Sequence, residues 1–210
     1  MILDGAWVTV ELTVLGCALA IVVAFAAGLG RLANSMIVRA VATAYIEFFR
    51  GTSIFVQLFW AYFVLPLFGL PLGPLQVGVL ALGLNVGAYG AEVVRGAIKA
   101  VPRDQYEAGI ALNLSPWQRL RHVILPQAFV IMLPTFGNNA IELLKGTAIV
   151  SLISLPDMTF QAQLVRAQTG NTLVPFLTIL ILYFILATII TVFMRGLERR
   201  LSRGLDVIKA

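Results

Sequence analysis

Four long stretches of this chain contain no charged residue, and this feature restricts the fold more than any other. The stretches are Leu12–Gly30, Gly51–Ala91, Val123–Ile141 and Ala167–Met194. A helix needs about 20 predominantly apolar residues to cross the hydrocarbon core of a bilayer, so each stretch is long enough to span a membrane. The chain is 12 % charged, whereas a soluble domain is about one quarter charged. We therefore expect an all-α integral membrane protein.

The second uncharged stretch has about twice the length that one span needs. It is interrupted by Leu65-Pro66 and by Pro71-Leu72-Gly73-Pro74, and a Gly/Pro cluster of this kind marks a tight turn. A division there predicts a single transmembrane domain, residues 1–210, with five transmembrane helices. The expected helices are residues 8–30, 41–65, 75–96, 123–145 and 173–194. Because Met1–Gly5 has no basic residue, the first helix is expected to be a true span and not a cleaved signal peptide.

The distribution of lysine and arginine predicts the orientation, because inner loops are enriched in these residues. With the N-terminus outside, the inner loops and the tail contain nearly all of the basic residues, and only Lys145 and Arg166 lie elsewhere. We therefore expect the C-terminus in the cytoplasm. The positive net charge of +5 reflects this orientation in the membrane. Membrane lipid is an expected partner, and nucleic acid is not.

Few residues are of the kind that performs catalysis or binds metals. Cys17 is the only cysteine and His122 the only histidine, so neither a disulfide nor a zinc site is expected. The sequence contains no Walker phosphate loop, no nucleophile elbow and no carboxylate pair suited to hydrolysis. We expect no enzyme activity and no bound cofactor in this chain.

The segment 99–122, between the third and fourth predicted helices, is expected on the inner face with a short helix of its own at 103–112. Pro102 suits the first helical turn, and Asn113 tolerates the left-handed conformation that ends a helix. The next helix begins with the capping box of Ser115, Pro116 and Gln118. Such a helix is either a docking element or an ordinary connecting loop, and these features alone do not distinguish the two.

This segment resembles the EAA loop of ABC-importer permeases, whose pattern is E-A-A, three residues, G, nine residues and I-x-L-P. The corresponding residues are Glu107-Ala108-Gly109, Asn113 and Val123-Ile124-Leu125-Pro126. Gly109, Asn113 and Val123 depart from the usual alanine, glycine and isoleucine. These departures preserve small size or turn formation.

Other segments are similar to the polar amino-acid uptake branch of those permeases. They are Tyr45–Trp60, Gly87–Ala108 and Glu142–Ile153, the last with Gly146 and Ala148 in place of the usual aspartate and serine. Within the branch, the motifs NLSPWQR, LPTFGN and SLPDMTFQAQ resemble permeases for ectoine and hydroxyectoine.

The resemblance implies a permease subunit of a bacterial ATP-driven importer in the cytoplasmic (inner) membrane. ATP and Mg²⁺ would be bound by a separate ATPase, and a second permease and a periplasmic or lipid-anchored solute-binding protein would complete the system. The small residues Gly83, Gly87 and Ala91 are a candidate interface with the second permease. The candidate ATPase-coupling residues are Tyr106, Glu107, Ala108, Gly109, Ile110, Ala111 and Asn113. An ion-gradient-driven carrier or small channel is the alternative.

Charged residues inside spans are costly and must face a partner or water. Glu47 and Arg50, Glu92 and Arg95, and Glu142 and Lys145 are each three apart, which places acid and base on one helix face. The first two sets suit internal neutralisation. Glu142 and Lys145 follow a polar stretch that is expected to be irregular and to lie beside protein or a water-filled cavity. The candidate solute-pathway residues are Asn138, Asn139, Glu142, Lys145, Gln57 and Glu92.

Three further segments have expected positions. Residues 148–155 are too short to cross the membrane and are expected to be re-entrant or interfacial. Residues 157–168 are either a surface for the solute-binding protein or an amphipathic connector. The basic tail, 195–210, is expected along the inner membrane surface.

Overall fold

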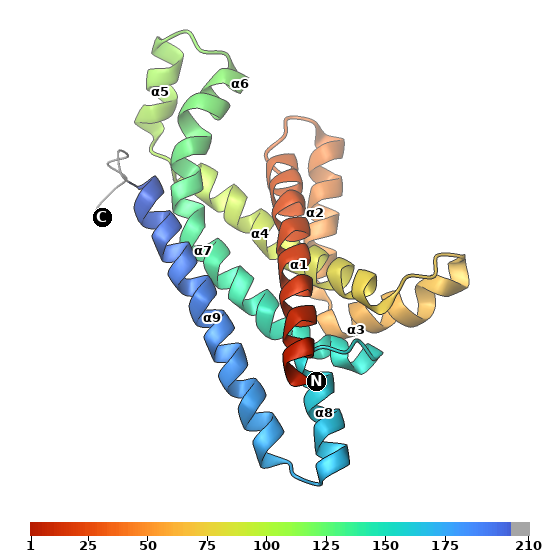
Figure 1. The fold of residues 1–210 in the computed structure, drawn as a ribbon. Coiled ribbons are helices and arrows are strands. Elements are labelled where there is room, and N and C mark those ends of the chain that lie inside the picture. Colours follow the sequence, from red (N-terminus) through yellow and green to blue (C-terminus); the bar gives the residue numbers. More distant parts are fainter. Residues whose placement is uncertain (203–210) are drawn as a thin grey trace.

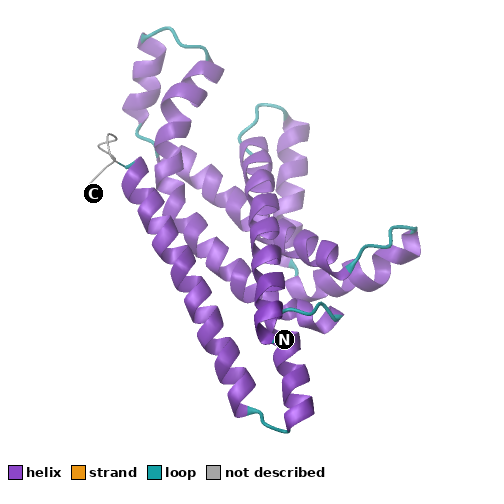
Figure 2. Cartoon of the chain, in the orientation of Figure 1, coloured by secondary structure: helices purple, strands orange, loops and turns teal. Residues whose placement is uncertain are grey.

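The computed structural model describes residues 1–202 (Figure 1), and this part of the chain consists of helices and loops without a strand (Figure 2). The α-helices are α1 (Ile2–Gly30), α2 (Met36–Gly51), α3 (Ile54–Phe59), α4 (Pro74–Ala100), α5 (Arg103–Ala111), α6 (Pro116–Arg119), α7 (Leu125–Gly146), α8 (Met158–Thr169) and α9 (Leu173–Leu201). The π-helical or 3-10 segments are η1 (Trp60–Val64), η2 (Leu65–Phe68), η3 (Leu120–Ile124) and η4 (Thr147–Ile153).

Four helical segments are long and apolar enough to cross a membrane, and α2 with the helical stretch 54–68 forms a bent candidate for a fifth. The predicted all-α membrane fold is therefore confirmed. Figure 1 shows the α5–α6 hairpin at the end of the molecule opposite the N-terminus and α8. These two ends are the natural candidates for the two sides of the membrane.

Small residues bring α1 and α4 into close contact. A Cβ added at Gly83 would lie 2.8 Å from Leu19 Cδ2, and one added at Gly28 would lie 2.8 Å from the backbone oxygen of Ala91. Gly87 faces Val23 in the same way, with 3.1 Å to its Cβ. The stripe of Gly83, Gly87 and Ala91 therefore packs within the chain, and the predicted interface with a second subunit has no support from it.

The prediction of one helix over residues 41–65 is wrong. The helix ends at Gly51, and α3 begins at Ile54 after a change of direction of 103°. Thr52 and Ser53 adopt extended backbone angles, so neither continues the α-helical hydrogen bonding. The uncharged run of residues crosses this break without interruption, which is why apolar length alone did not reveal it.

At the end near the N-terminus, α1 packs against the turn that precedes α8. The hydroxyl of Thr9 accepts a hydrogen bond from the backbone N–H of Met158 at 3.2 Å. A Cβ on Gly5 would lie 2.7 Å from the backbone oxygen of Asp157. The Asp157 side chain is fully buried and caps α8 by accepting from the N–H groups of Thr159 and Phe160. Asp157 therefore cannot form part of the surface predicted at 157–168, although exposed residues such as Gln163 and Arg166 remain available.

The other predicted segments are defined as follows. Residues 147–153 form the 3-10 helix η4, which follows α7 directly and is largely buried. Residues 195–201 continue α9 without a break, so they are its last turns and not a separate surface element. Residues 203–210 of the predicted tail lie outside the described residues.

Replacement of Asp157 tests the capped turn through the pH dependence of stability. Burial raises the pKa of Asp157 above its ordinary value of 3.8, and hydrogen bonds from Phe160 and Thr159 act in the opposite direction. A carboxyl group whose pKa is raised by folding contributes stability that is complete below its unfolded pKa and is lost as pH rises through the folded pKa. Asp157→Asn keeps an acceptor and is uncharged at every pH, so at pH 7 it should unfold in detergent at a higher temperature than the parent.

This advantage should shrink as the pH is lowered through the folded-state pKa of Asp157, because the parent carboxyl then becomes neutral as well. Asp157→Ala is the matched loss-of-cap variant and should be about 1 kcal/mol less stable than Asp157→Asn at neutral and acid pH alike, because both variants are uncharged. An advantage of the asparagine variant that grows under acid conditions would contradict this description of Asp157.

Candidate functional site

A groove of about 320 Å³ lies where α3, α4, α7 and η4 meet. Glu142 and Lys145 of α7 both line it, and both side chains are exposed. The sequence had predicted that these two residues border a cavity, and their role in a solute pathway stays a prediction. The lining residues are Ile54, Leu82, Asn85, Val86, Tyr89, Glu142, Leu143, Lys145, Gly146 and Ile149.

The two charges in the groove are not neutralised by each other. Within residues 1–202, neither Glu142 nor Lys145 forms an ion pair within 4.0 Å. Their backbone is also regular, because α7 is one helix from Leu125 to Gly146 with Pro134 inside it. The predicted irregularity before Glu142 is therefore wrong: the irregular segments are η3, before α7, and η4, directly after it. A regular helix presents a carboxylate and an ammonium group, both free, to the same groove.

Two amide side chains brace the bend between α2 and α3. The Phe49 carbonyl, near the end of α2, accepts hydrogen bonds from Asn85 Nδ2 at 2.9 Å and from Gln57 Nε2 at 3.0 Å. Asn85 Nδ2 also donates to Gln57 Oε1 at 3.1 Å, and Gln57 Nε2 donates to Thr52 Oγ1 at 2.7 Å. These bonds satisfy a helix-end carbonyl that the break leaves without an intrahelical partner.

This brace changes the interpretation of Gln57 and adds a residue that the sequence had not indicated. Gln57, a predicted pathway residue, is not among the residues that line the groove. Asn85 does line it and is 9 % exposed. In the sequence, Asn85 is distinguished only as a polar amide within an uncharged, mostly apolar stretch.

The predicted pairing of Glu47 with Arg50 is wrong. The Arg50 guanidinium lies over the ring of Tyr89, 5.3 Å from its centroid, in a cation–π arrangement. Glu47 instead approaches Arg31, with 3.6 Å between Glu47 Oε1 and Arg31 Nη2. Because Tyr89 lines the groove, Arg50 adds a positive charge beside it.

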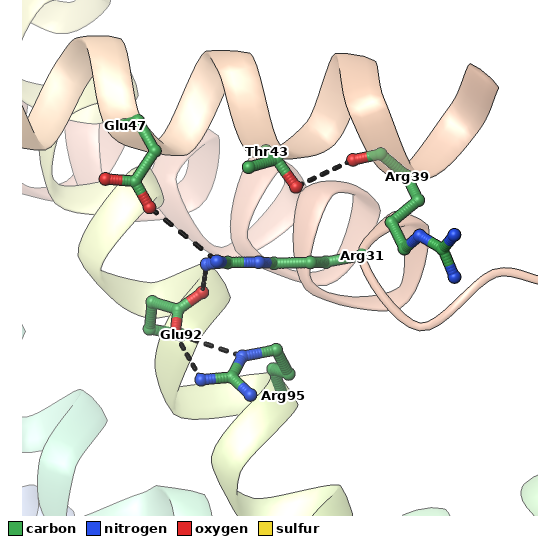
Figure 3. Close-up of polar contacts among 6 residues, drawn as sticks. All are labelled: Arg31, Arg39, Thr43, Glu47, Glu92 and Arg95. Carbon is green, nitrogen blue, oxygen red and sulfur yellow. Dashed lines mark hydrogen bonds and ion pairs between the residues drawn. The ribbon is translucent and has the colours of Figure 1, made fainter. Parts of the chain in front are cut away.

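Glu92 is held in an ion network and does not line the groove. Arg31 at the end of α1 donates to Glu92 Oε1, and Arg95 donates to Glu92 Oε2 through Nε at 3.0 Å and Nη2 at 2.7 Å (Figure 3). The predicted pair of Glu92 and Arg95 is thus present, with Arg31 as a further partner. The network joins α1, α2 and α4, so the geometry gives Glu92 a structural position and not a place in the groove.

A second hollow, of about 550 Å³, is almost entirely apolar and lies between α1, α4, α7 and α9. Asn139 lines it together with Cys17, Phe136 and Met194, and its Nδ2 is buried without a hydrogen-bond partner among the described residues. Asn138 is exposed and lines neither hollow. Neither of the two asparagines predicted for the pathway therefore lines the groove of Glu142 and Lys145, although Asn138 lies about one helical turn before Glu142 on α7.

The inner side of α5 is fixed to the rest of the chain. Tyr106 donates its hydroxyl to the Ile98 carbonyl at 3.0 Å, and Gln127 Nε2 donates to Gln105 Oε1 at 3.0 Å. Burial raises the pKa of Tyr106, against an opposing effect of Arg119, which favours the protonated hydroxyl that donates. Gly109 is buried, and a Cβ added there would lie 2.8 Å from Arg119 Cδ. Tyr106 and Gly109 thus pack inward and are not on the free face of the helix.

The outer side of α5 and the following turn expose apolar groups without a partner in the described chain. Ile110 is 61 % exposed, Leu112 73 % and Trp117 62 %. The exposed candidate coupling residues are Glu107, Ala108, Ile110, Ala111 and Asn113. Asn113 has a φ of 55°, which confirms the left-handed helix end that was predicted there. The capping box of Ser115 and Gln118 is also present.

These features define a class: a helical membrane protein with a charged groove beside its bent span and a rigid, partly apolar hairpin beyond its membrane helices. The chain belongs to the family described as "Binding-protein-dependent transport system inner membrane component", whose match covers residues 13–203.

Several curated relatives match nearly the whole chain. A probable amino-acid ABC transporter permease protein, y4tF, of Sinorhizobium fredii is 47 % identical over 95 % of this chain and 86 % of its own length. The glutamine transport system permease protein GlnP of Escherichia coli K12 is 36 % identical over 96 % of this chain and 93 % of its own. The L-cystine transport system permease protein TcyB of Bacillus subtilis is 34 % identical over 95 % and 86 %.

Solved structures show the same fold. A crystal structure of an amino acid ABC transporter with histidines matches with a TM-score of 0.88 and 34 % identity, over 95 % of this chain and 93 % of the other. The inward-facing MetNI methionine ABC transporter matches with a TM-score of 0.80 over 95 % of each chain. At 21 % identity, the second match shows the fold alone.

The ion network predicts different effects for its two acidic residues. Glu92→Gln removes the charge that Arg31 and Arg95 share, so it should lower the stability of the purified protein by about 1–3 kcal/mol. Glu47→Gln is the matched control, because the Glu47 side chain is 62 % exposed and lies 3.6 Å from Arg31, and it should change stability little. Thermal unfolding in detergent measures both variants, and equal losses would contradict the structural position given to Glu92.

Proposed function

We propose that this chain is the membrane-spanning permease subunit of a bacterial ABC importer for a polar amino acid or an amino-acid-like solute. Family membership supports a binding-protein-dependent transport system, and relatives at 36 % and 34 % identity are named for glutamine and cystine. ATP and Mg²⁺ are bound by a separate ATPase subunit, and this chain is not an enzyme by itself. A solute-binding protein and a second permease, identical or homologous, complete the importer.

The observation that carries the proposal is the pair of free charges in the groove. An amino acid at neutral pH has a carboxylate and an ammonium group. The groove offers Lys145 to the first and Glu142 to the second, and neither is occupied by an ion pair within residues 1–202. Intramembrane charges without a structural partner suggest a substrate pathway.

The α5–α6 hairpin is the proposed contact with the ATPase. Its inner side is fixed through Tyr106, Gln105 and Gly109, so a force on its outer side is transmitted to α4 and α7 without loss in a flexible loop. The outer side presents small and apolar residues, which suits close packing into a groove of a partner. Cytoplasmic placement of this hairpin gives an N-terminus outside and a C-terminus inside, in agreement with the lysine and arginine distribution.

The identity of the solute is the finer part of the proposal. Glutamine, cystine and histidine are names attached to relatives or to a similar structure, and ectoine is the solute indicated by the resemblance of short motifs. Reconstitution with the partner subunits, followed by ATP-dependent uptake of these compounds, tests the function. Uptake by this chain alone without ATP would favour the alternative of an ion-driven carrier.

Neutralisation of the groove charges tests the proposed pathway. Glu142→Gln and Lys145→Met should each reduce solute uptake in reconstituted vesicles by about tenfold or more, because each removes a charge-assisted hydrogen bond to the solute. Since the structure shows no ion pair between them, the double variant should not recover uptake.

The control for these variants is Asn138→Ala, which changes the same helix outside the groove and should retain uptake. Expression, thermal stability and basal ATPase activity should stay close to the parent in all four variants. Recovery of uptake in the double variant would instead assign Glu142 and Lys145 to the scaffold.

A charge on the outer side of α5 tests the proposed coupling. Ala111→Glu places a carboxylate in the expected interface, and desolvation of that charge should weaken copurification of the ATPase by at least about tenfold. Ala111→Ser is the matched control, because it is small and uncharged at the same position. Normal ATPase association and transport in the glutamate variant would exclude this face of α5 as the docking surface.

A further inference from the structure

We propose that Asn85 recognises the solute directly, and that its Oδ1 accepts a hydrogen bond from an N–H group on the cationic end of the solute. This inference rests on the proposed function, because it needs a solute in the groove. It extends the recognition site from the two charged residues of α7 to an amide on α4.

The hydrogen bonds of Asn85 determine which way its amide points. Nδ2 lies 2.9 Å from the Phe49 carbonyl oxygen and 3.1 Å from Gln57 Oε1. A backbone carbonyl only accepts, so the group that faces it must be the donor –NH₂ and not the oxygen. Gln57 Nε2 faces the same carbonyl at 3.0 Å, which leaves Gln57 Oε1 as the acceptor for Asn85. The Phe49 carbonyl therefore fixes the orientation of both amides.

This orientation leaves Oδ1 of Asn85 free. It has no hydrogen-bond partner within residues 1–202, yet it is not among the fully buried unpaired side-chain atoms of that region, which are Asn139 Nδ2 and Gln161 Oε1. Oδ1 is therefore not fully buried and is accessible to a molecule outside the protein core. Because Asn85 lines the groove and is 9 % exposed, the groove is the space to which this acceptor is offered.

The groove thus offers two acceptors, Oδ1 of Asn85 and the Glu142 carboxylate. It is also lined by one ammonium group, that of Lys145. A primary ammonium group has several N–H donors and suits two acceptors at once. A quaternary trimethylammonium group has none, so it would leave Oδ1 desolvated without a partner, and sites built for an N–H group discriminate against such analogues. The predicted solute class is an amino acid, or a related cation, that retains N–H groups, and not a betaine.

The test measures solute binding to the permease–ATPase complex without the solute-binding protein, so that the permease alone selects. Labelled L-glutamine is displaced by unlabelled L-glutamine or by its N,N,N-trimethyl derivative, with L-cystine and L-histidine as replacement probes. The parent should prefer the primary amine, and Asn85→Leu should reduce this preference by about tenfold. Leucine is close to asparagine in size, so steric exclusion of the methyl groups is retained.

Gln57→Met is the matched control, because it removes the neighbouring amide and leaves Oδ1 of Asn85 in place. A lower affinity of this variant for labelled L-glutamine is compatible with the inference, but its preference for the primary amine should persist. If the Asn85→Leu preference equals that of the parent, or if Gln57→Met loses the preference equally, the inference is wrong while the proposed function stands. Failure of the parent to bind any of the probes would overturn the proposed solute groove and this inference together.

Discussion

The hydrocarbon core of a membrane contains no water to satisfy polar groups, and this constraint explains how the chain places the charged residues of its long helices. Glu92 receives two arginines, Arg31 and Arg95, from the ends of two helices. Arg50 rests on the ring of Tyr89. Glu142 and Lys145 receive no protein partner within residues 1–202. Charges that the fold leaves free at such a position require water or a solute, and both are available in a groove.

The same constraint shapes the backbone. The break between α2 and α3 leaves helix-end groups without intrahelical partners, and the amides of Asn85 and Gln57 satisfy the Phe49 carbonyl. One consequence is a bent span whose position depends on side chains of α3 and α4. Another is that the brace lies beside the groove, since Asn85 belongs to both. Recognition of a solute and the position of the bend are therefore connected through one residue.

The sequence predicted features that depend on local chemistry or on apolar length. It identified the all-α fold, the helix end at Asn113, the capping box at Ser115 and the ion pair between Glu92 and Arg95. It failed at the bend at Thr52 and Ser53, because the uncharged run continues across the break. It also failed where contacts join separate segments, as in the pairing of Glu47 with Arg31 and the inward packing of Tyr106 and Gly109. The stripe of Gly83, Gly87 and Ala91 was correctly singled out as a contact surface, but a pattern on one helix does not state which helix it meets.

The central claim is that Glu142 and Lys145 hold the two ends of a zwitterionic solute. The most direct measurement is a cryo-electron microscopy structure of the complete importer with solute bound, compared with the solute-free importer. The claim predicts solute density in the groove, with its carboxylate beside Lys145 and its ammonium beside Glu142. Solute density elsewhere, or ion pairs that occupy both residues in the presence and absence of solute, would contradict it.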